Sequence, residues 1–238
     1  MSGTSKFKLA LNFAANRENL QLYHTTAKYL IAAYIMGVCN ELSDLRGTLL
    51  SNRNKTLPDL GFDILPYSPS VVWLCDPLNK LALALVLARI LRSQNKKLLA
   101  CIFMDAHITM MLLRGVCLPW TTFPAAFPEC YNRLTAKPDN IFIEPIKRMF
   151  RADGLSSWCH DLLFSGHAVV FVLVAMFLHD SGGAIWWRLI GWVGGLFGCL
   201  LLTITRQHYS IDIIVAIIIT YLVYLQWRKE VIRLFQPV

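Results

Sequence analysis

The sequence predicts an all-α integral membrane protein, built as a bundle of six transmembrane helices. Of its 238 residues, 55% are hydrophobic and 16% are charged, and the mean hydropathy is +0.47. This composition is too apolar for a soluble domain of the same length. Apolar runs of roughly the length that crosses a bilayer recur along the chain. Short polar clusters lie at the ends of two of these runs and carry the candidate chemistry.

The apolar runs define six candidate spans, at about 27–42, 70–91, 98–118, 161–178, 185–205 and 209–227. The first run is short for a bilayer crossing. The second carries Asp76 and Lys80 in its first half, and their i,i+4 spacing predicts an internal ion pair. The third contains Asp105, His107 and Arg114, which are expected to face the inside of the bundle.

Two connections have their own signatures. The stretch 119–158 contains five prolines, which predict a cap or re-entrant segment in place of a long helix. The fifth span carries glycines that predict close packing against a neighbouring helix; they are Gly191, Gly194, Gly195 and Gly198.

An even number of spans places both chain ends on one side of the membrane. Lysines and arginines gather in the short segments of that side, so the positive-inside rule predicts cytosolic termini. The predicted division is a cytosolic segment 1–26, a six-span domain 27–227 and a cytosolic tail 228–238. Because this orientation explains the net charge of +8, nucleic acid is not an expected partner.

The seven cysteines include no C-x-x-C pair, so they define neither a zinc site nor a disulfide framework. Cys117, Cys130 and Cys159 lie near one polar loop, and a bridge among them is left open.

The two polar clusters each contain a histidine. His208 and Asp212 are four residues apart, so on a helix they share one face, and the carboxylate can hold one imidazole nitrogen. His167 ends the cluster Cys159-His-Asp161-Leu-Leu-Phe-Ser165-Gly-His167. Two histidines on the same side of the membrane indicate phosphoryl transfer through a phosphohistidine, with the second histidine as proton donor.

A phosphate group also needs hydrogen-bond donors, and arginine matches its oxygens best. Arg114 and Arg206 are the candidates. Asp161 is expected either to cap a helix or to orient a catalytic group.

The two clusters resemble the motifs of sphingomyelin synthases and related sphingolipid synthases. Cys159 to His167 is similar to the pattern C-G-D-x-x-x-S-G-H-T, and His208-Tyr-Ser-Ile-Asp212-Ile-Ile-Val-Ala216 is similar to H-Y-x-x-D-V-x-x-A. Arg206, just before the second motif, is similar to inositol phosphorylceramide synthases. The chain departs from the first pattern at His160, where the family has glycine, and at Ala168, where it has threonine.

The resemblance implies a member of the wider lipid phosphatase group that moves a phosphorylated head group from a glycerophospholipid to ceramide and releases diacylglycerol. His208 would attack the phosphorus, Asp212 would orient it, and His167 would act as acid and then as base. The expected location is the Golgi or the plasma membrane, with the site on the lumenal or exoplasmic face. No cofactor or metal is implied, and the partners are membrane lipids. The head group and the oligomeric state, including a homo-oligomer, are left open.

Other functions compete with this one. Hydrolysis at the same site would give a phospholipase C or a lipid phosphatase, and acceptor choice depends on the exclusion of water. A transporter would use Asp105, His107 and Arg114 as an ion path. A zinc hydrolase is the weakest alternative, because its helical ligand pair would place a histidine where Asp212 stands.

Overall fold

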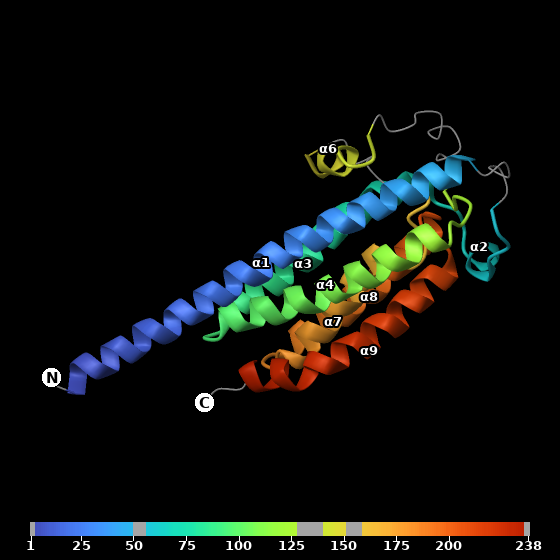
Figure 1. Cartoon of the computed structure of the whole chain (residues 1–238). Coiled ribbons are helices and arrows are strands. Elements are labelled where there is room, and N and C mark those ends of the chain that lie inside the picture. The colour runs from blue at the N-terminus through green and yellow to red at the C-terminus, as the bar shows by residue number, and fades with distance from the viewer. Residues whose placement is uncertain (1–2, 50–55, 128–139, 151–158, 236–238) are drawn as a thin grey trace.

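The computed structural model describes residues 3–49, 56–127, 140–150 and 159–235, and every regular element in these ranges is a helix. The elements are α1 (Gly3–Leu49), α2 (Leu60–Ile64), the 3₁₀ helix η1 (Pro69–Leu74), α3 (Cys75–Leu91), α4 (Lys96–Trp120), α6 (Glu144–Phe150), α7 (Gly166–Asp180), α8 (Ile185–Ile204) and α9 (Ser210–Phe235). Figure 1 shows them as one elongated bundle. The predicted all-α fold is confirmed for the described residues.

The six long helices alternate in direction along the bundle. Helices α1, α4 and α8 run toward the end where α2 lies, and α3, α7 and α9 run back (Figure 1). At the end of the bundle away from α2, side-chain contacts join neighbouring helices. The Asn95 side-chain amide, just before α4, donates to the Leu234 carbonyl of α9 at 2.8 Å, and Arg228 of α9 pairs with Asp180 of α7 at 3.0 Å. As a result, α1 begins and α9 ends at the same end of the bundle (Figure 1).

Four helical stretches are long and apolar enough to cross a membrane, namely Pro69–Leu91, Lys96–Trp120, Ile185–Ile204 and Ser210–Phe235. Helix α7 is apolar but has only 15 residues. Helix α1 has 47 residues and passes through residue 26 without a break. The membrane character of the chain is therefore supported, whereas the count of six spans, their sidedness and the domain division remain predictions.

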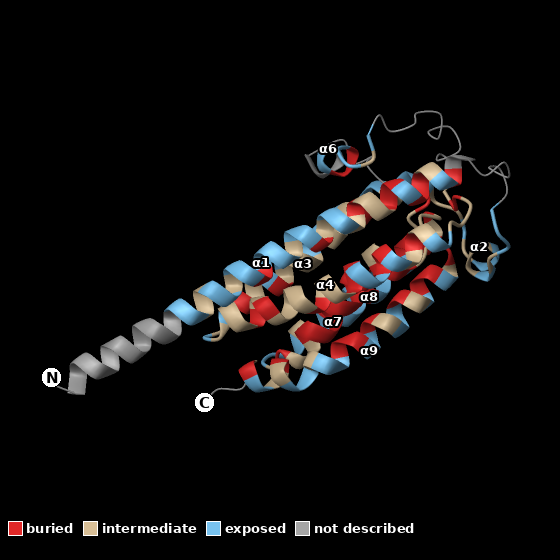
Figure 2. Ribbon diagram, in the orientation of Figure 1, coloured by how far each residue is buried: buried red, intermediate tan, exposed pale blue. Residues whose placement is uncertain are grey.

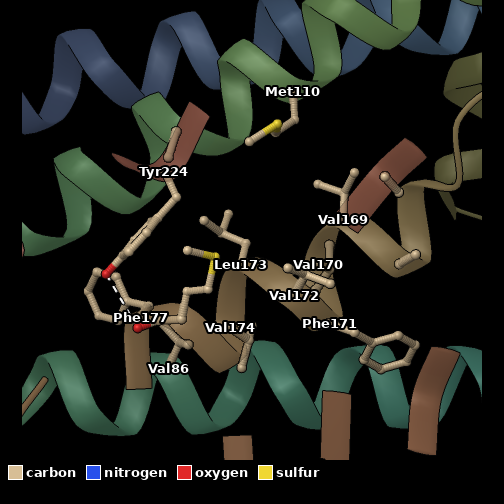
Figure 3. Close-up of a cluster of buried hydrophobic side chains, with 14 of the residues drawn as sticks. Val86, Met110, Val169, Val170, Phe171, Val172, Leu173, Val174, Phe177 and Tyr224 are labelled. Carbon is tan, nitrogen blue, oxygen red and sulfur yellow. Dashed lines mark hydrogen bonds between the residues drawn. The ribbon is translucent and has the colours of Figure 1, made fainter. Parts of the chain in front are cut away.

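Helix α7 is the centre of the bundle. Every residue from Ala168 to Leu178 is buried, and α7 packs against α3, α4, α8 and α9. Figure 2 shows the buried residues concentrated on α7 and on the faces turned toward it. In Figure 3, the valines and Phe177 of α7 lie among Val86 of α3, Met110 of α4 and Tyr224 of α9. A helix that is apolar on all sides fits this central position.

The glycines of α8 allow it to approach α7 closely. A Cβ atom on Gly198 would lie 2.6 Å from the Phe171 ring, and one on Gly195 would lie 3.2 Å from the Phe171 carbonyl oxygen. Gly191 is similarly close to Ala175. The packing prediction is confirmed for these three glycines but wrong for Gly194, whose Cβ would meet no atom within 4 Å.

The predicted cap over 119–158 is described only in part, since 128–139 and 151–158 lie outside the described residues. In the described part, α6 packs against α1. A Cβ on Gly37 of α1 would lie 2.8 Å from the Pro145 Cβ, so this contact requires glycine at that position.

Candidate active site

His167 lies in the first turn of α7 and faces α3. The Ser165 hydroxyl caps this helix by accepting from the Ala168 N–H at 3.2 Å. The His167 Nε2 atom is 2.9 Å from Asp76 Oδ1, in the first turn of α3. Of the two roles considered for Asp161, capping of α7 is therefore excluded. The predicted ion pair between Asp76 and Lys80 is wrong, because Asp76 binds His167.

His208 lies in the turn between α8 and α9, not on the helix itself as the spacing suggested. Its Nδ1 atom is 3.7 Å from Asp212 Oδ2, and the two side chains are 6% and 0% exposed. The same carboxylate accepts the Tyr209 N–H at 3.1 Å, which fixes its position at the start of α9.

The His208 imidazole is held in its neutral form by burial, which lowers its pKa to about 3 against the opposing effect of the Asp161 carboxylate. A neutral imidazole has a free lone pair and is the nucleophilic form. His208 Nδ1 and Asp212 Oδ1 have no hydrogen-bond partner. The carboxylate oxygen nearest to His208 Nδ1 is Oδ2, which already accepts from the Tyr209 N–H.

The two histidine motifs come together at one end of the bundle. The centroids of the His167 and His208 rings are 6.3 Å apart, with the planes inclined by 55°. The backbone joins the motifs directly, because the Ser165 N–H donates to the Asp212 carbonyl at 3.2 Å. Thus His167, His208 and Asp212, predicted from separate stretches of sequence, lie in one site. Asp76 is the additional carboxylate that sequence reasoning did not place there.

Arg114 lies beneath this site and is 2% exposed. Its guanidinium forms an ion pair with Asp161 and donates from Nε to the Phe164 carbonyl at 2.5 Å. Gly166 leaves room for it, since a Cβ there would lie 2.7 Å from Arg114 Nη1. Arg114 and Asp161 therefore hold the loop that leads into α7.

Arg206 has a different environment. Its guanidinium carbon lies 5.2 Å from the centroid of the Phe62 ring and 4.9 Å from that of Tyr67. Among the described residues no carboxylate pairs with it, and its Nε has no hydrogen-bond partner. Arg206 is thus a cation held between two aromatic rings, with donors free for an anion.

His160, one of the two departures from the family pattern, faces away from the paired histidines. Its N–H donates to Asp44 Oδ1 at 2.7 Å, its Nδ1 atom is 3.3 Å from the same oxygen, and its carbonyl accepts from the Ser43 hydroxyl at 2.9 Å. A Cβ on Gly47 of α1 would clash with the His160 imidazole, so glycine leaves room for the ring. His160 therefore anchors the motif loop to α1 and does not contact the site.

Two further residues, to which the sequence patterns assigned no role, fix the turn that carries His208. Asp59 caps α2 and also accepts from the N–H and the hydroxyl of Ser210, both at 2.7 Å. The Tyr209 hydroxyl lies 3.1 Å from the Leu57 N–H and 3.0 Å from the Pro124 carbonyl. The sequence signal was the polar Asp59 in an otherwise apolar Leu-Pro-Asp-Leu-Gly-Phe stretch, but nothing local identified its partner.

Two of the three side chains considered for an ion path, those of His107 and Arg114, have separate partners. His107 Nδ1 is 2.9 Å from the Tyr29 hydroxyl of α1. Arg114 is paired with Asp161, whereas the contact of Asp105 is made by its backbone carbonyl, which accepts from the Thr109 hydroxyl at 3.0 Å. These contacts do not connect the three side chains into a chain.

Cys159, at the start of the first motif, is disulfide-bonded, whereas Cys117 is free. Cys117 therefore does not form the bridge to Cys159 that the sequence left open, and Cys130 lies outside the described residues.

Comparison with known proteins supports the interpretation of the two motifs. Residues 158–229 match the family described as PAP2 superfamily C-terminal. The chain is 27% identical to the sphingomyelin synthase-related 1 protein of Caenorhabditis elegans over 183 residues, which is 72% of this chain and 37% of that protein.

Two further relatives carry the names of transferases. The chain is 30% identical to phosphatidylcholine:ceramide cholinephosphotransferase 2 of Rattus norvegicus, over 69% of this chain and 47% of that protein. It is 29% identical to the phosphatidylethanolamine:ceramide ethanolaminephosphotransferase of Trypanosoma brucei brucei, over 50% of this chain and 36% of that protein. The chain spans less than half of the length of these curated relatives. The resemblance to sphingomyelin synthases and related ceramide phosphotransferases within the PAP2 superfamily, predicted from the two histidine motifs, is confirmed.

Proposed function

We propose that the chain is a sphingolipid synthase, which transfers a phosphorylated head group from a glycerophospholipid to ceramide and releases diacylglycerol. One observation carries the proposal: His167 and His208 face each other with 6.3 Å between ring centroids, and each has a carboxylate beside it. This distance leaves room for a phosphorus atom close to one ring and an alcohol oxygen close to the other.

In the first half-reaction, the neutral His208 attacks the phosphorus of the donor lipid. A nitrogen–phosphorus bond forms, and the bond from phosphorus to the diacylglycerol oxygen breaks. His167 gives its proton to that oxygen, since an alkoxide is a poor leaving group without a proton donor. Asp212 orients the His208 ring and stabilises the positive charge that develops on it.

In the second half-reaction, the roles of His167 reverse. It takes the proton of the ceramide hydroxyl, whose oxygen attacks the phosphorus and displaces His208. The Asp76 carboxylate, 2.9 Å from His167 Nε2, keeps the ring oriented through both steps. A histidine held by a carboxylate is suited to giving and taking one proton near neutral pH.

Arg206 is the better candidate for binding the phosphate oxygens. It has no acidic partner among the described residues, so its charge is available to the substrate. Arg114 is already bound to Asp161 and to the Phe164 carbonyl. We assign Arg114 and Asp161 to positioning the loop before His167.

The disulfide at Cys159 supports a site on the lumenal or exoplasmic face, because disulfides persist in oxidising compartments. This agrees with the sidedness that the charge distribution predicts. The location that the resemblance implies, a multi-pass protein of the Golgi or the plasma membrane with its lipid substrates as partners, is part of the proposal.

Hydrolysis is the second candidate function. The side chains of His167 and Asp76 are 29% and 41% exposed, so water can reach the acid–base group. Water in place of ceramide would release the same diacylglycerol, together with a free phosphorylated head group.

The test is a reconstitution assay with labelled ceramide and single phospholipid donors that carry choline, ethanolamine, inositol or glycerol. We expect a phosphosphingolipid product from at least one donor, and its loss in His208→Ala and in His167→Ala. His24→Ala, on the exposed surface of α1, is the matched control and should retain activity. Diacylglycerol release without a ceramide product would favour hydrolysis. If no donor is consumed, or the two histidine variants remain active, the proposal is refuted.

A further inference from the structure

A polar cavity lies at the opposite end of the bundle from the histidines. Its volume is about 470 Å³, and its lining includes His179, Gly182, Arg188, Arg228, Ile232 and Phe235. Helix α7 separates the two sites, since it begins beside His167 and ends at Asp180. Its 15 residues correspond to about 20 Å of helix. The cavity is therefore not part of the site described above.

The walls of this cavity carry an excess of positive charge. Arg228 pairs with Asp180 through Nε at 3.0 Å and Nη2 at 3.4 Å, and this aspartate side chain is only 6% exposed. Arg188 is exposed and has no acidic partner among the described residues. One buried carboxylate thus faces two guanidinium groups. Arg89 adds a third beside the cavity, where it binds Ser181 and not an acid.

A neutral hydrogen-bond donor, the His179 imidazole, also lines the cavity. The Trp192 indole N–H donates to His179 Nδ1 at 3.2 Å, so the neutral imidazole carries its proton on Nε2. Gly182 has φ +66°, and a Cβ there would meet no atom within 4 Å. The turn between α7 and α8 therefore leaves open space in front of these donors.

The cavity is also amphipathic. Ile232 and Phe235 of α9 supply apolar lining next to the arginines, and the Arg89 guanidinium carbon lies 4.5 Å from the centroid of the Phe235 ring. Trp186 and Trp192 of α8 are 67% and 48% exposed beside the same turn. Exposed tryptophans at helix ends are typical of the boundary between lipid and water. A ligand at this place can keep an anionic group on the arginines and an apolar part against α9.

We propose that this cavity binds the anionic head group of a phospholipid in the leaflet opposite the candidate active site. The class of ligand is a lipid phosphate with net negative charge. Basic pockets between transmembrane helices bind such head groups. A zwitterionic lipid should bind more weakly here, because the arginines repel the cationic part of its head group.

The first experiment measures lipid retention on the purified full chain in detergent by native mass spectrometry. The probes are phosphatidylserine, phosphatidylcholine and inorganic phosphate, each added alone. We expect phosphatidylserine to bind more tightly than phosphatidylcholine, and Arg188→Gln to weaken phosphatidylserine binding about fivefold, the effect of one arginine near a membrane surface. The matched control is Arg233→Gln, which removes an arginine of α9 that is paired with Glu230 outside the cavity.

A second pair of variants keeps the test independent of Arg188. Asparagine and aspartate both tolerate a positive φ, so Gly182→Asn and Gly182→Asp place nearly the same shape in the cavity with different charge. The aspartate variant should bind phosphatidylserine more weakly than the asparagine variant. Equal binding of the two phospholipids, or equal losses in Arg188→Gln and Arg233→Gln, would overturn the proposal. Inorganic phosphate that binds as tightly as phosphatidylserine would show a site for the free anion and would overturn the lipid assignment.

Discussion

The contact between Asp76 and His167 gives the sharpest test of the site. Replacing Asp76 by asparagine keeps an oxygen that accepts from His167 Nε2 but removes the negative charge. A hydrogen bond to a charged group contributes about 1.5 to 3 kcal/mol. Because the Asp76 side chain is 41% exposed and the asparagine retains an acceptor, we expect the smaller end of this range. A loss of about 1.4 kcal/mol in the barrier corresponds to a tenfold slower reaction.

The assay is the rate of head-group transfer in reconstituted protein at saturating donor. Asp76→Asn should lower kcat about tenfold, and Asp76→Ala, which also removes the acceptor, should lower it about 100-fold. Asp105→Asn is the matched control, because Asp105 is a carboxylate in α4 whose contact, from the Thr109 hydroxyl to its backbone carbonyl, involves neither His167 nor His208. Wild-type rates in Asp76→Asn and Asp76→Ala, alongside an inactive His167→Ala, would refute a positioning role for Asp76. Equal losses in the Asp105 control would point to a general effect on the bundle.

Three further outcomes follow from the geometry. Tyr209→Phe removes the hydroxyl that bonds the Leu57 N–H and the Pro124 carbonyl, so the melting temperature in detergent should fall by about 4 °C. Ser165→Ala removes the cap of α7 and should cost about 1 kcal/mol of stability, measured by denaturant unfolding. Burial lowers the pKa of His208 from 6.5 to about 3, so the unfolded chain binds more protons in that range, and stability should fall as the pH drops below about 6.5. This decrease is measured by thermal melting at pH 7 and pH 5, and it should be smaller in His208→Asn than in the wild type. An identical decrease in the two proteins would contradict the low pKa of His208.

Local sequence patterns were enough to predict the helical class and the pairing of the two histidine clusters. The clusters stood out because polar residues at the ends of apolar runs have few structural explanations in a membrane. Hydropathy also located the four stretches that the structure shows to be long and apolar enough to cross a bilayer. What was predicted well therefore depends on composition and spacing within one segment.

The contacts between distant segments could not be predicted in this way. Asp76 had a nearby Lys80 at helical spacing, yet its partner is His167, 91 residues later. Asp59 holds Ser210 across 151 residues. The length of α1 is a different case, since hydropathy defines where a membrane span is possible and not where a helix stops. No proline occurs between Gly3 and Leu49, so the helix continues beyond the apolar run at both ends.

The bond between Asp59 and Ser210 also bears on the order in which the protein is made. Ribosomes add about 5 to 20 residues per second, so Asp59 is synthesised roughly 8 to 30 s before the serine that it binds. During that interval the segment around α2 lacks the partner that fixes it. A chain stopped before α9 would contain His167, Asp76 and His208 but neither Ser210, which holds the turn, nor Asp212, the carboxylate beside His208. The candidate site is therefore assembled only when the last long helix joins the bundle.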